Sequence, residues 1–128
     1  MKARAAAALP AQDLERARRW YAEKLGLTPV DAGGGLLYEM AEGTTFIVFR
    51  SSGKPSGDHT QMGLTVDDVE QTVAELRGRG VRFEQYESDG FKTVNDIVEV
   101  EGRKNAWFKD SEGNLIVIGP PVRVGAGR

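Results

Sequence analysis

The chain has 128 residues, with 17 Lys and Arg against 19 Asp and Glu and no cysteine, so its formal net charge is −2. This length is enough for one compact domain with its own hydrophobic core. The near balance of charges argues against nucleic acid or a membrane surface as a partner, and the lack of cysteine excludes disulfides and thiolate chemistry. The apolar run before Pro10 is shorter than the roughly 7–15 residues of a signal peptide, and no run reaches the ~20 residues of a membrane span, so we expect a cytoplasmic protein.

The first half of the chain predicts a strand, a helix and three more strands. The strand covers residues 3–8, and Asp13 then caps the helix, because a carboxylate accepts hydrogen bonds from the free N–H groups of the first turn. Gly26 is placed to end this helix. The apolar face of the helix consists of Leu14, Ala17, Tyr21 and Leu25. The three later strands are expected at residues 27–32, 36–40 and 44–50.

The second half predicts the same order of elements. A short apolar segment at residues 60–66 precedes a helix, for which Asp67 and Glu70 suggest a capping box and Gly78 or Gly80 the end. Its apolar stripe consists of Val69, Val73 and Leu76. The strands that follow are expected at residues 81–86, 105–109 and 114–118.

The two halves look like copies of one unit. The stretch LPAQDLERA from Leu9 matches LTVDDVEQT from Leu64 in its spacing of Leu, Asp, Leu or Val, and Glu. The sequence therefore predicts an α+β fold of two tandem βαβββ modules within a single domain over residues 1–128. Module one spans about residues 1–52 and module two about residues 58–121.

The acidic stretch DSEGN brings Asp110, Glu112 and Asn114 close together around Gly113, which raises the possibility of a cation site. It lies between two predicted strands, where a tight reversal needs Gly113 or Asn114 at positive φ. A calcium loop of the EF-hand type needs about 12 residues between two helices, and the flanks here are strands. We therefore interpret DSEGN as a turn.

Three segments together resemble the vicinal oxygen chelate superfamily, the glyoxalase/bleomycin resistance protein/dioxygenase group. They are DLERARRWYAEKLGL, VDDVEQTVAELRGRGVRF and AWFKDSEGNLIVI. The resemblance spans nearly the whole chain. It implies paired modules whose curved sheets surround a cleft, with two modules facing each other within a chain or across a homodimer.

Metal-dependent members of this family carry His, Gln or Glu ligands on the first and last strand of each module. Counting from Asp13, Asp67 and the two turn glycines, these positions fall on Ala6, Gln61, Ile47 and Val117. A catalytic metal needs about three oxygen or nitrogen ligands, and three of these four side chains are apolar. The resemblance is thus to a branch without the metal site, related to bleomycin resistance proteins, and we expect no metal and no cofactor.

The predicted ligand site is the lining of the cleft. Strand alternation places Gln61 and Val117 on the cleft side, and Trp107, Ile47 and Phe49 are expected to join them. The candidates for the rim are Tyr38, Tyr86 and Phe91. Such a wall suits flat hydrophobic molecules held by stacking, although each of these aromatic residues also fits the core.

His59 is the one histidine of the sequence. It lies two residues before Gln61, so the pair fits contact with a ligand, but it also ends the loop SSGKPSGD, where a solvated side chain is ordinary. Residues 88–105 are longer than a hairpin needs, and we interpret them as a lid or a dimer arm. The acids of this segment, Asp89, Asp96, Glu99 and Glu101, either attract a cationic drug or form a solvated surface.

The favoured function is a metal-free protein that sequesters a hydrophobic or aromatic small molecule, such as an antibiotic, as a homodimer. The first alternative is a metal-dependent enzyme of the glyoxalase, dioxygenase or epimerase type, or one that uses an acid–base pair such as Gln61 with Glu39. A second alternative is an interaction module whose sheet pairs with another protein.

Overall fold

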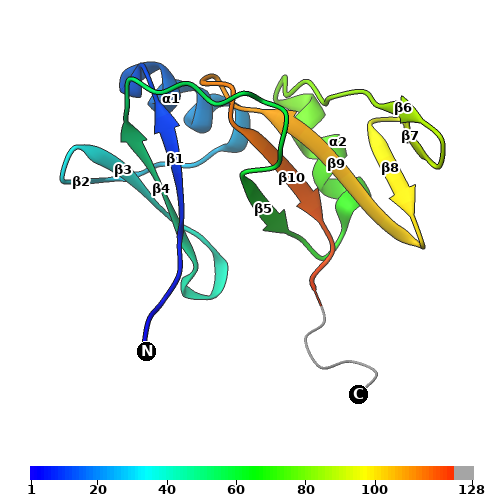
Figure 1. The fold of residues 1–128 in the computed structure, drawn as a ribbon, viewed down its shortest axis with the longest axis horizontal. Helices are drawn as coiled ribbons and strands as arrows, with labels where there is room; N and C mark the ends of the chain where they lie inside the picture. Colours follow the sequence, from blue (N-terminus) through cyan, green and yellow to red (C-terminus); the bar gives the residue numbers. More distant parts are fainter. Residues whose placement is uncertain (123–128) are drawn as a thin grey trace.

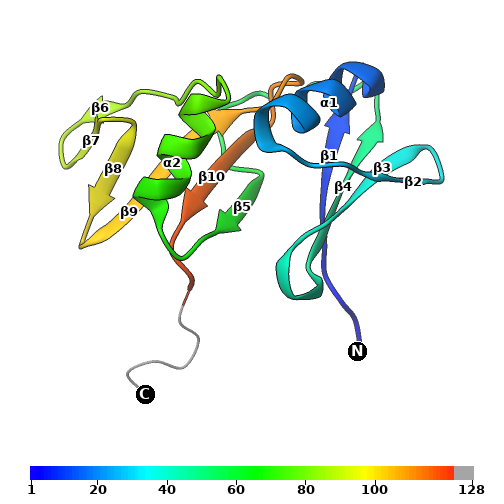
Figure 2. The ribbon, with the colours of Figure 1, turned by 180° about the vertical axis from the view of Figure 1, so that it is seen from behind.

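The computed structural model describes residues 1–122. Two sheets lie side by side, one from each half of the chain (Figure 1), and seen from behind both main helices lie in front of the strands (Figure 2). Each sheet therefore has one face covered by helices and one face turned away from them, which we call the open face. No helix among residues 1–122 is long and apolar enough to cross a membrane.

Module one follows the predicted order. Its elements are β1 (Ala7–Ala11), α1 (Leu14–Trp20), the π-helical turn η1 (Tyr21–Leu25), β2 (Val30–Ala32), β3 (Gly35–Glu39), the 3-10 turn η2 (Ala41–Gly43) and β4 (Thr45–Arg50). The sheet order is β1-β4-β3-β2, with β1 parallel to β4. The first strand begins later than the expected residues 3–8, because residues Ala3 to Ala6 have no strand to pair with.

The ends of the helices follow the local chemistry of their caps. Asp13 caps α1 and accepts from the backbone N–H of Arg16 at 2.9 Å, as predicted. Gly26 ends η1 with a φ of 69°, in the left-handed region that glycine adopts without a steric penalty. In module two the cap of α2 (Val69–Gly78) is Asp68, which accepts from Gln71 N–H at 2.9 Å, so the capping box predicted from Asp67 is wrong by one residue.

Module two has the same topology with an enlarged sheet. Its strands are β5 (Met62–Thr65), β6 (Glu87–Ser88), β7 (Phe91–Val94), β8 (Ile97–Val100), β9 (Arg103–Lys109) and β10 (Leu115–Gly119), in the order β5-β10-β9-β8-β7-β6. Strand β5 runs parallel to β10, as β1 does to β4. Strand β8 lies beside β9 as β2 lies beside β3, so β8 takes the place in its sheet that β2 has in module one.

Module two differs from the prediction in two places. Residues 81–86 form only an isolated bridge, from Phe83 to Phe108, instead of a strand. The segment 88–105, expected to be a lid or arm, is built into the sheet as β7, β8 and the start of β9. The two-residue loops Asn95-Asp96 and Glu101-Gly102 have positive φ throughout, as in the type I′ turns that join paired strands, so successive hairpins extend the sheet edge.

The core lies between the helices and the sheets and joins the modules. Trp20 of α1 stacks on Phe108 of β9, with ring centroids 5.9 Å apart, and Tyr21 packs against Tyr38 at 5.1 Å and Phe46 at 5.7 Å. All but Trp20 are nearly inaccessible to solvent. Because α1 of module one packs on β9 of module two, the two modules share one hydrophobic core.

Candidate functional site

The strand register decides which side chains lie on each open face. In the second sheet, Trp107 pairs with Val117, and Asn105 pairs with Val98. Directly paired residues point to the same side of a sheet, and alternate residues along a strand share a face. Trp107, Asn105, Val98 and Val117 therefore lie on the open face, whereas Phe108 and Ile116 lie beneath the helices.

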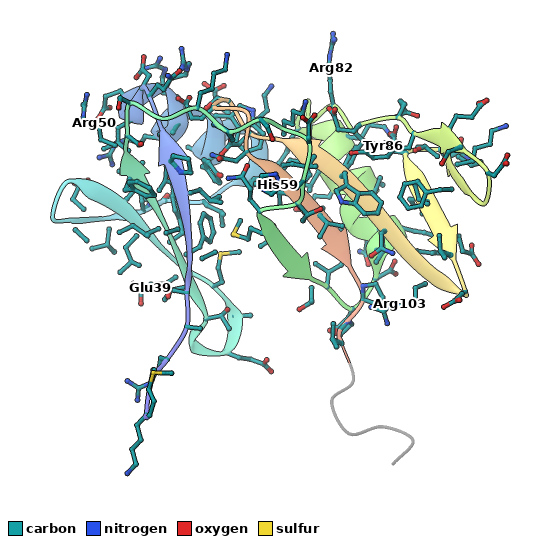
Figure 3. All side chains as sticks on the ribbon, in the orientation of Figure 1. Glu39, Arg50, His59, Arg82, Tyr86 and Arg103 are labelled. Carbon is teal, nitrogen blue, oxygen red and sulfur yellow. The ribbon has the colours of Figure 1, made fainter. Side chains whose placement is uncertain are left out.

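Three aromatic rings meet on this open face. Trp107 lies 5.6 Å from Tyr86 and 5.5 Å from Phe91, and Tyr86 lies 5.7 Å from Phe91. We call Tyr86, Phe91 and Trp107 the aromatic cluster. All three were predicted to line the site, and the structure brings them together from the segment before β6, from β7 and from β9; Tyr86 is labelled in Figure 3.

The orientation of Trp107 is fixed by a residue that the sequence did not single out. Its indole N–H donates to the hydroxyl of Thr60 at 3.0 Å, and Thr60 lies in the loop before β5. A fixed ring loses little conformational freedom when a ligand stacks on it. A lone threonine in a loop gives no sequence signal of this contact, because hydroxyl side chains are common in loops.

The aromatic cluster lies beside buried residues that do not belong to the main core. Val98 is 1% exposed and Leu115 is 4% exposed, yet neither is part of the cluster beneath the helices. Close to Val98, the Asn105 amide lies against Gly119, where an added Cβ would come within 2.5 Å of Asn105 Oδ1. The glycine thus leaves room for the only amide side chain on the β9 part of this face.

The open face of the first sheet is apolar. Ile47 pairs with Ala8 and Leu37, and Phe49 pairs with Pro10 and Gly35, so these side chains share one face. Phe49 is 37% exposed and Val30, at the edge of the same face, is 52% exposed. The predicted site residues Ile47 and Phe49 therefore lie together, but on the other sheet from the aromatic cluster.

Tyr38 does not lie at the rim of a cleft, and that prediction is wrong. It pairs with Phe46, which faces the helices, and its ring stacks on Phe46 at 4.8 Å. The side chain is 1% exposed, and its hydroxyl has no hydrogen-bond partner among the described residues. Burial raises the pKa of Tyr38 to about 12. Leu37, the preceding residue, occupies the open face instead.

Gln61 and His59 are the two polar residues that we expected at the site. The Gln61 amide N–H donates to Asn114 Oδ1 at 3.0 Å, and its oxygen accepts from the backbone N–H of Leu115 at 3.3 Å. Both ends of this amide thus already have protein partners. His59 (Figure 3) is exposed, which agrees with a solvated residue at the end of its loop, and its Nδ1 lies 3.5 Å from Ser56 Oγ.

The DSEGN stretch is a turn, as predicted, and its oxygens are occupied by protein donors. Asp110 accepts from Tyr21 O–H at 2.6 Å, from Glu112 N–H at 2.8 Å and from Asn114 N–H at 3.0 Å, while Gly113 has a φ of 91°. Asn114 also donates to the Pro10 carbonyl at 3.0 Å. These bonds connect β10 and its turn to β1 and to η1, so the turn links the two modules.

Glu112 adds further hydrogen bonds between the same turn and module one. Its carboxylate accepts two hydrogen bonds from Arg16, at 2.8 and 3.0 Å, and one from the Asp13 backbone N–H at 3.0 Å. Burial by itself would raise the pKa of Glu112, but the hydrogen bonds from Arg16, Asp13 and Ser111 and the charge of Arg16 lower it to about 2. Sequence reasoning missed this function because the partners lie almost a hundred residues apart along the chain.

The four positions of the family's metal ligands hold no suitable donor set. The register places Ala8 opposite Ile47 and Gly63 opposite Val117, two residues along each first strand from the positions counted as Ala6 and Gln61. With either count, at most one side chain, the engaged amide of Gln61, offers an oxygen or nitrogen, so these residues do not fit a catalytic metal. Within residues 1–122, no group of three His, Cys, Asp or Glu side chains is placed to hold a metal ion.

Two of the acids of residues 88–105, Asp96 and Glu99, do not face the aromatic cluster. Asp96 pairs with Arg77 at 2.9 Å and accepts from Gln85 at 2.8 Å. Glu99 pairs in register with Lys104, on the side opposite to Trp107. For Asp96 and Glu99 the structure therefore agrees with the solvated charged surface and not with attraction of a cationic drug to the cleft.

A cavity of about 650 Å³ lies where the two modules meet, beside the edges of β1 and β5, and we call it the seam cavity. Gln61 is the one predicted site residue among its lining residues. The aromatic cluster, Ile47, Phe49 and Val117 lie outside it. The structure thus has an apolar cavity at the seam and an aromatic surface on the open face.

Comparisons with known proteins agree with the fold. The family model for the Glyoxalase/Bleomycin resistance protein/Dioxygenase superfamily matches residues 4–118. No curated protein matches the sequence.

Three solved structures show the range of proteins with this fold. A bleomycin-binding protein complexed with bleomycin has a TM-score of 0.69 at 18% identity, covering 94% of this chain and 100% of that one. TnmS3, an antibiotic binding protein from Streptomyces sp. CB03234, has a TM-score of 0.65 at 23% identity, covering 95% and 99%. The oxidase ChaP-H2 has a TM-score of 0.67 at 21% identity, covering 100% of both chains. At these identities the likeness is one of fold.

Proposed function

We propose that this chain, which belongs to the Glyoxalase/Bleomycin resistance protein/Dioxygenase superfamily, binds a flat aromatic or hydrophobic small molecule without a metal and acts by sequestering it. The observation that carries the proposal is the aromatic cluster on the open face, with Trp107 held by Thr60. A planar ligand that stacks on such rings gains roughly 0.5–1.5 kcal/mol per aromatic pair beyond the burial of its area. Sequestration requires no acid, base or nucleophile.

The residues at the family's metal positions support binding over catalysis. Ile47, Val117, Ala8 and Gly63 supply neither oxygen nor nitrogen, so the substrate of a metal-dependent enzyme would find no Lewis acid at this place. The acid–base pair suggested for Gln61 and Glu39 has little support either, because the Gln61 amide is bonded to Asn114 and Leu115. The same four apolar positions enlarge the hydrophobic surface available to a ligand.

A homodimer would turn the two open faces into an enclosed site. In one chain the sheets lie side by side (Figure 1), so a ligand on the aromatic cluster is covered on one side only. The apolar face with Phe49, Ile47 and Val30 is suited to cover the cluster of a second copy. Specific small-molecule sites bury most of the ligand surface, and a facing sheet provides that burial.

The polar residues around the aromatic cluster favour a neutral or anionic ligand. The strand residues of this open face include Arg103, Asn105 and Lys109 of β9, and by register no carboxylate. Glu84 lies near Lys109, at 3.7 Å, and offsets that charge, whereas within residues 1–122 the one acceptor of Arg103 is the Pro120 carbonyl at 3.5 Å. A cationic ligand gains no opposite charge here, and an anionic one has Arg103 within the same face.

Isothermal titration tests the proposal with a neutral planar anthraquinone and with its anionic counterpart anthraquinone-2-sulfonate as probes. Trp107→Ala should weaken the binding of the probe that the protein accepts by about tenfold or more, since it removes the central ring of the cluster. Val94→Ala is the matched control, because Val94 is exposed on the opposite face of the same sheet and should leave affinity unchanged. Equal binding by the wild type and Trp107→Ala would reject the aromatic cluster as the site.

Metal analysis separates binding from metal-dependent catalysis. The fold is shared with an oxidase, so an enzyme is a real alternative for this scaffold. Protein purified without added metal should contain no stoichiometric divalent ion, because the donor set is absent. A stoichiometric metal that is lost in a Gln61→Ala variant would support the enzyme and contradict metal-free binding.

A further inference from the structure

The seam cavity lies between two strand edges that do not pair with each other. Strand β1 is the edge of the first sheet and β5 is the edge of the second, and the two sheets remain separate. Edge strands carry backbone N–H and C=O groups on the side away from their own sheet, and such groups can bond a ligand.

The walls of this cavity are apolar and come from both modules. Leu27, Met40 and Phe46 contribute from module one, and Met62 and Leu64 from module two. The volume of about 650 Å³ falls within the roughly 300–1,000 Å³ of small-molecule sites. No member of the aromatic cluster lines it, so this cavity is separate from the site proposed above.

The charged residues of the cavity have one sign. Its lining includes Glu42 and Glu75 but no Lys, Arg or His. Neither carboxylate takes part in an ion pair within residues 1–122. Glu42 is held in the left-handed region, with a φ of 58°, by the turn that carries it to the cavity. An apolar cavity with acidic residues and no basic ones favours a ligand with an apolar body and a positive charge.

We propose that the seam cavity is a second binding site, which takes an elongated amphiphilic cation, such as a long-chain amine. The hydrocarbon body lies against Leu27, Phe46 and Leu64, and the ammonium group lies toward Glu42 and Glu75. This ligand differs in charge preference from the one proposed for the aromatic cluster. The two sites are therefore distinguishable by ligand class as well as by position.

The methionines of the chain provide a direct readout. There are three, of which Met40 and Met62 line the cavity, whereas Met1 is fully exposed. Protein labelled with ¹³C at the methionine methyl groups is titrated with decylamine, decanol and decanoate, all below their aggregation concentrations. We expect saturable shifts of the Met40 and Met62 signals with decylamine, none of Met1, and at least tenfold weaker binding of decanoate.

Two sets of variants test the position and the charge. Ala41→Trp places a large ring at an exposed lining position, and Ala74→Trp adds the same ring at an exposed position of α2 outside the cavity. Decylamine affinity should fall at least fivefold in Ala41→Trp and stay unchanged in Ala74→Trp. In the double variant Glu42→Gln with Glu75→Gln, decylamine should bind no more tightly than decanol.

The results separate support from contradiction. Absence of saturable Met40 and Met62 shifts with decylamine overturns the site, and so do shifts that are the same in Ala41→Trp and the wild type. Decanoate binding as tight as decylamine binding overturns the ligand class. Trp107→Ala, which removes the central ring of the aromatic cluster, should leave decylamine binding intact, and a parallel loss at both places would show that the sites are not separate.

Discussion

The hydroxyl of Tyr21 donates a hydrogen bond to Asp110 Oδ2 at 2.6 Å, and this contact joins the helix of module one to the turn before the last strand of module two. Both groups are buried. Burial and the negative charge of Asp110 raise the pKa of Tyr21, so the phenol stays protonated and remains a donor at neutral pH. The modules are therefore held together by a charge-assisted bond within their common core.

Tyr21→Phe removes this bond and should lower the free energy of unfolding by about 1.5–3 kcal/mol, because hydrogen bonds to charged groups contribute that much. Urea denaturation of both proteins measures the difference. Tyr86→Phe is the matched control: the Tyr86 hydroxyl makes no hydrogen bond among residues 1–122, so its removal should change stability by less than about 0.5 kcal/mol. If Tyr21→Phe were as stable as the control, the bond from Tyr21 to Asp110 would not be what holds the modules together.

Tyr38→Phe should have the opposite effect. The Tyr38 hydroxyl is buried without a partner among the described residues, and an unsatisfied buried polar group costs about 1–3 kcal/mol. The ring itself stays in place against Phe46, at 4.8 Å, when the oxygen is removed. We expect the variant to unfold at a urea concentration equal to or above that of the wild type. Clear destabilisation would show that the hydroxyl has a partner, such as a buried water.

The pH dependence of stability should report on Glu112. Its pKa is about 2 in the folded protein and 4.5 without the fold, so it stabilises the fold fully above pH about 4.5 and loses this effect as the pH falls toward 2. At pH 7, Glu112→Gln should therefore cost about 2–3 kcal/mol. The difference from the wild type should shrink at pH 3 and below.

Glu23→Gln provides the comparison for Glu112→Gln. Glu23 is exposed and forms no ion pair within the described part of the chain. Unfolding of both variants and the wild type is followed in urea at several pH values. A Glu112→Gln deficit that stays constant from pH 7 to pH 2.5 would be inconsistent with a lowered carboxyl pKa.

Gly119 should be sensitive to substitution although its φ is not in the left-handed region. A Cβ there would lie 2.5 Å from Asn105 Oδ1, which forces the amide to move, whereas a Cβ on Gly63 of the neighbouring strand would meet Val117 at an ordinary 3.5 Å. Gly119→Ala should cost about 1–3 kcal/mol by overpacking, and Gly63→Ala much less. Adding Asn105→Ala to Gly119→Ala should restore most of the loss, and failure of this rescue would place the strain elsewhere.

The tandem modules were predictable because helix caps and strand periodicity are local signals. Asp13, Gly26 and the repeat at Leu9 and Leu64 led to the correct order of elements in module one. The side of Tyr38 was not predictable, because Leu36 and Leu37 precede it and adjacent apolar residues give no alternation.

The missed parts of module two depend on contacts between distant segments. Residues 81–86 have strand composition, but β8 occupies the place beside β9 and leaves only the Phe83 bridge. The loop Asn95-Asp96 lacks the glycine that usually marks a type I′ turn, so the hairpin was not recognised. Likewise, the bond from Trp107 to Thr60 follows from the register of the whole sheet, which spacing along the chain does not reveal.

Thr60→Val tests whether that bond prepares the aromatic cluster for a ligand. Valine keeps the size of the side chain and removes the acceptor of the Trp107 indole N–H, at 3.0 Å in the structure. Because Thr60 is exposed, stability should change by less than about 0.5 kcal/mol, while affinity for an aromatic probe should fall about threefold to tenfold as the ring gains freedom. Calorimetric titration gives the affinity, and the indole N–H signal in NMR reports the ring environment. Thr60→Ser retains the hydroxyl and should keep wild-type affinity, so an equal loss in both variants would show that Thr60 acts through its bulk and not through the bond.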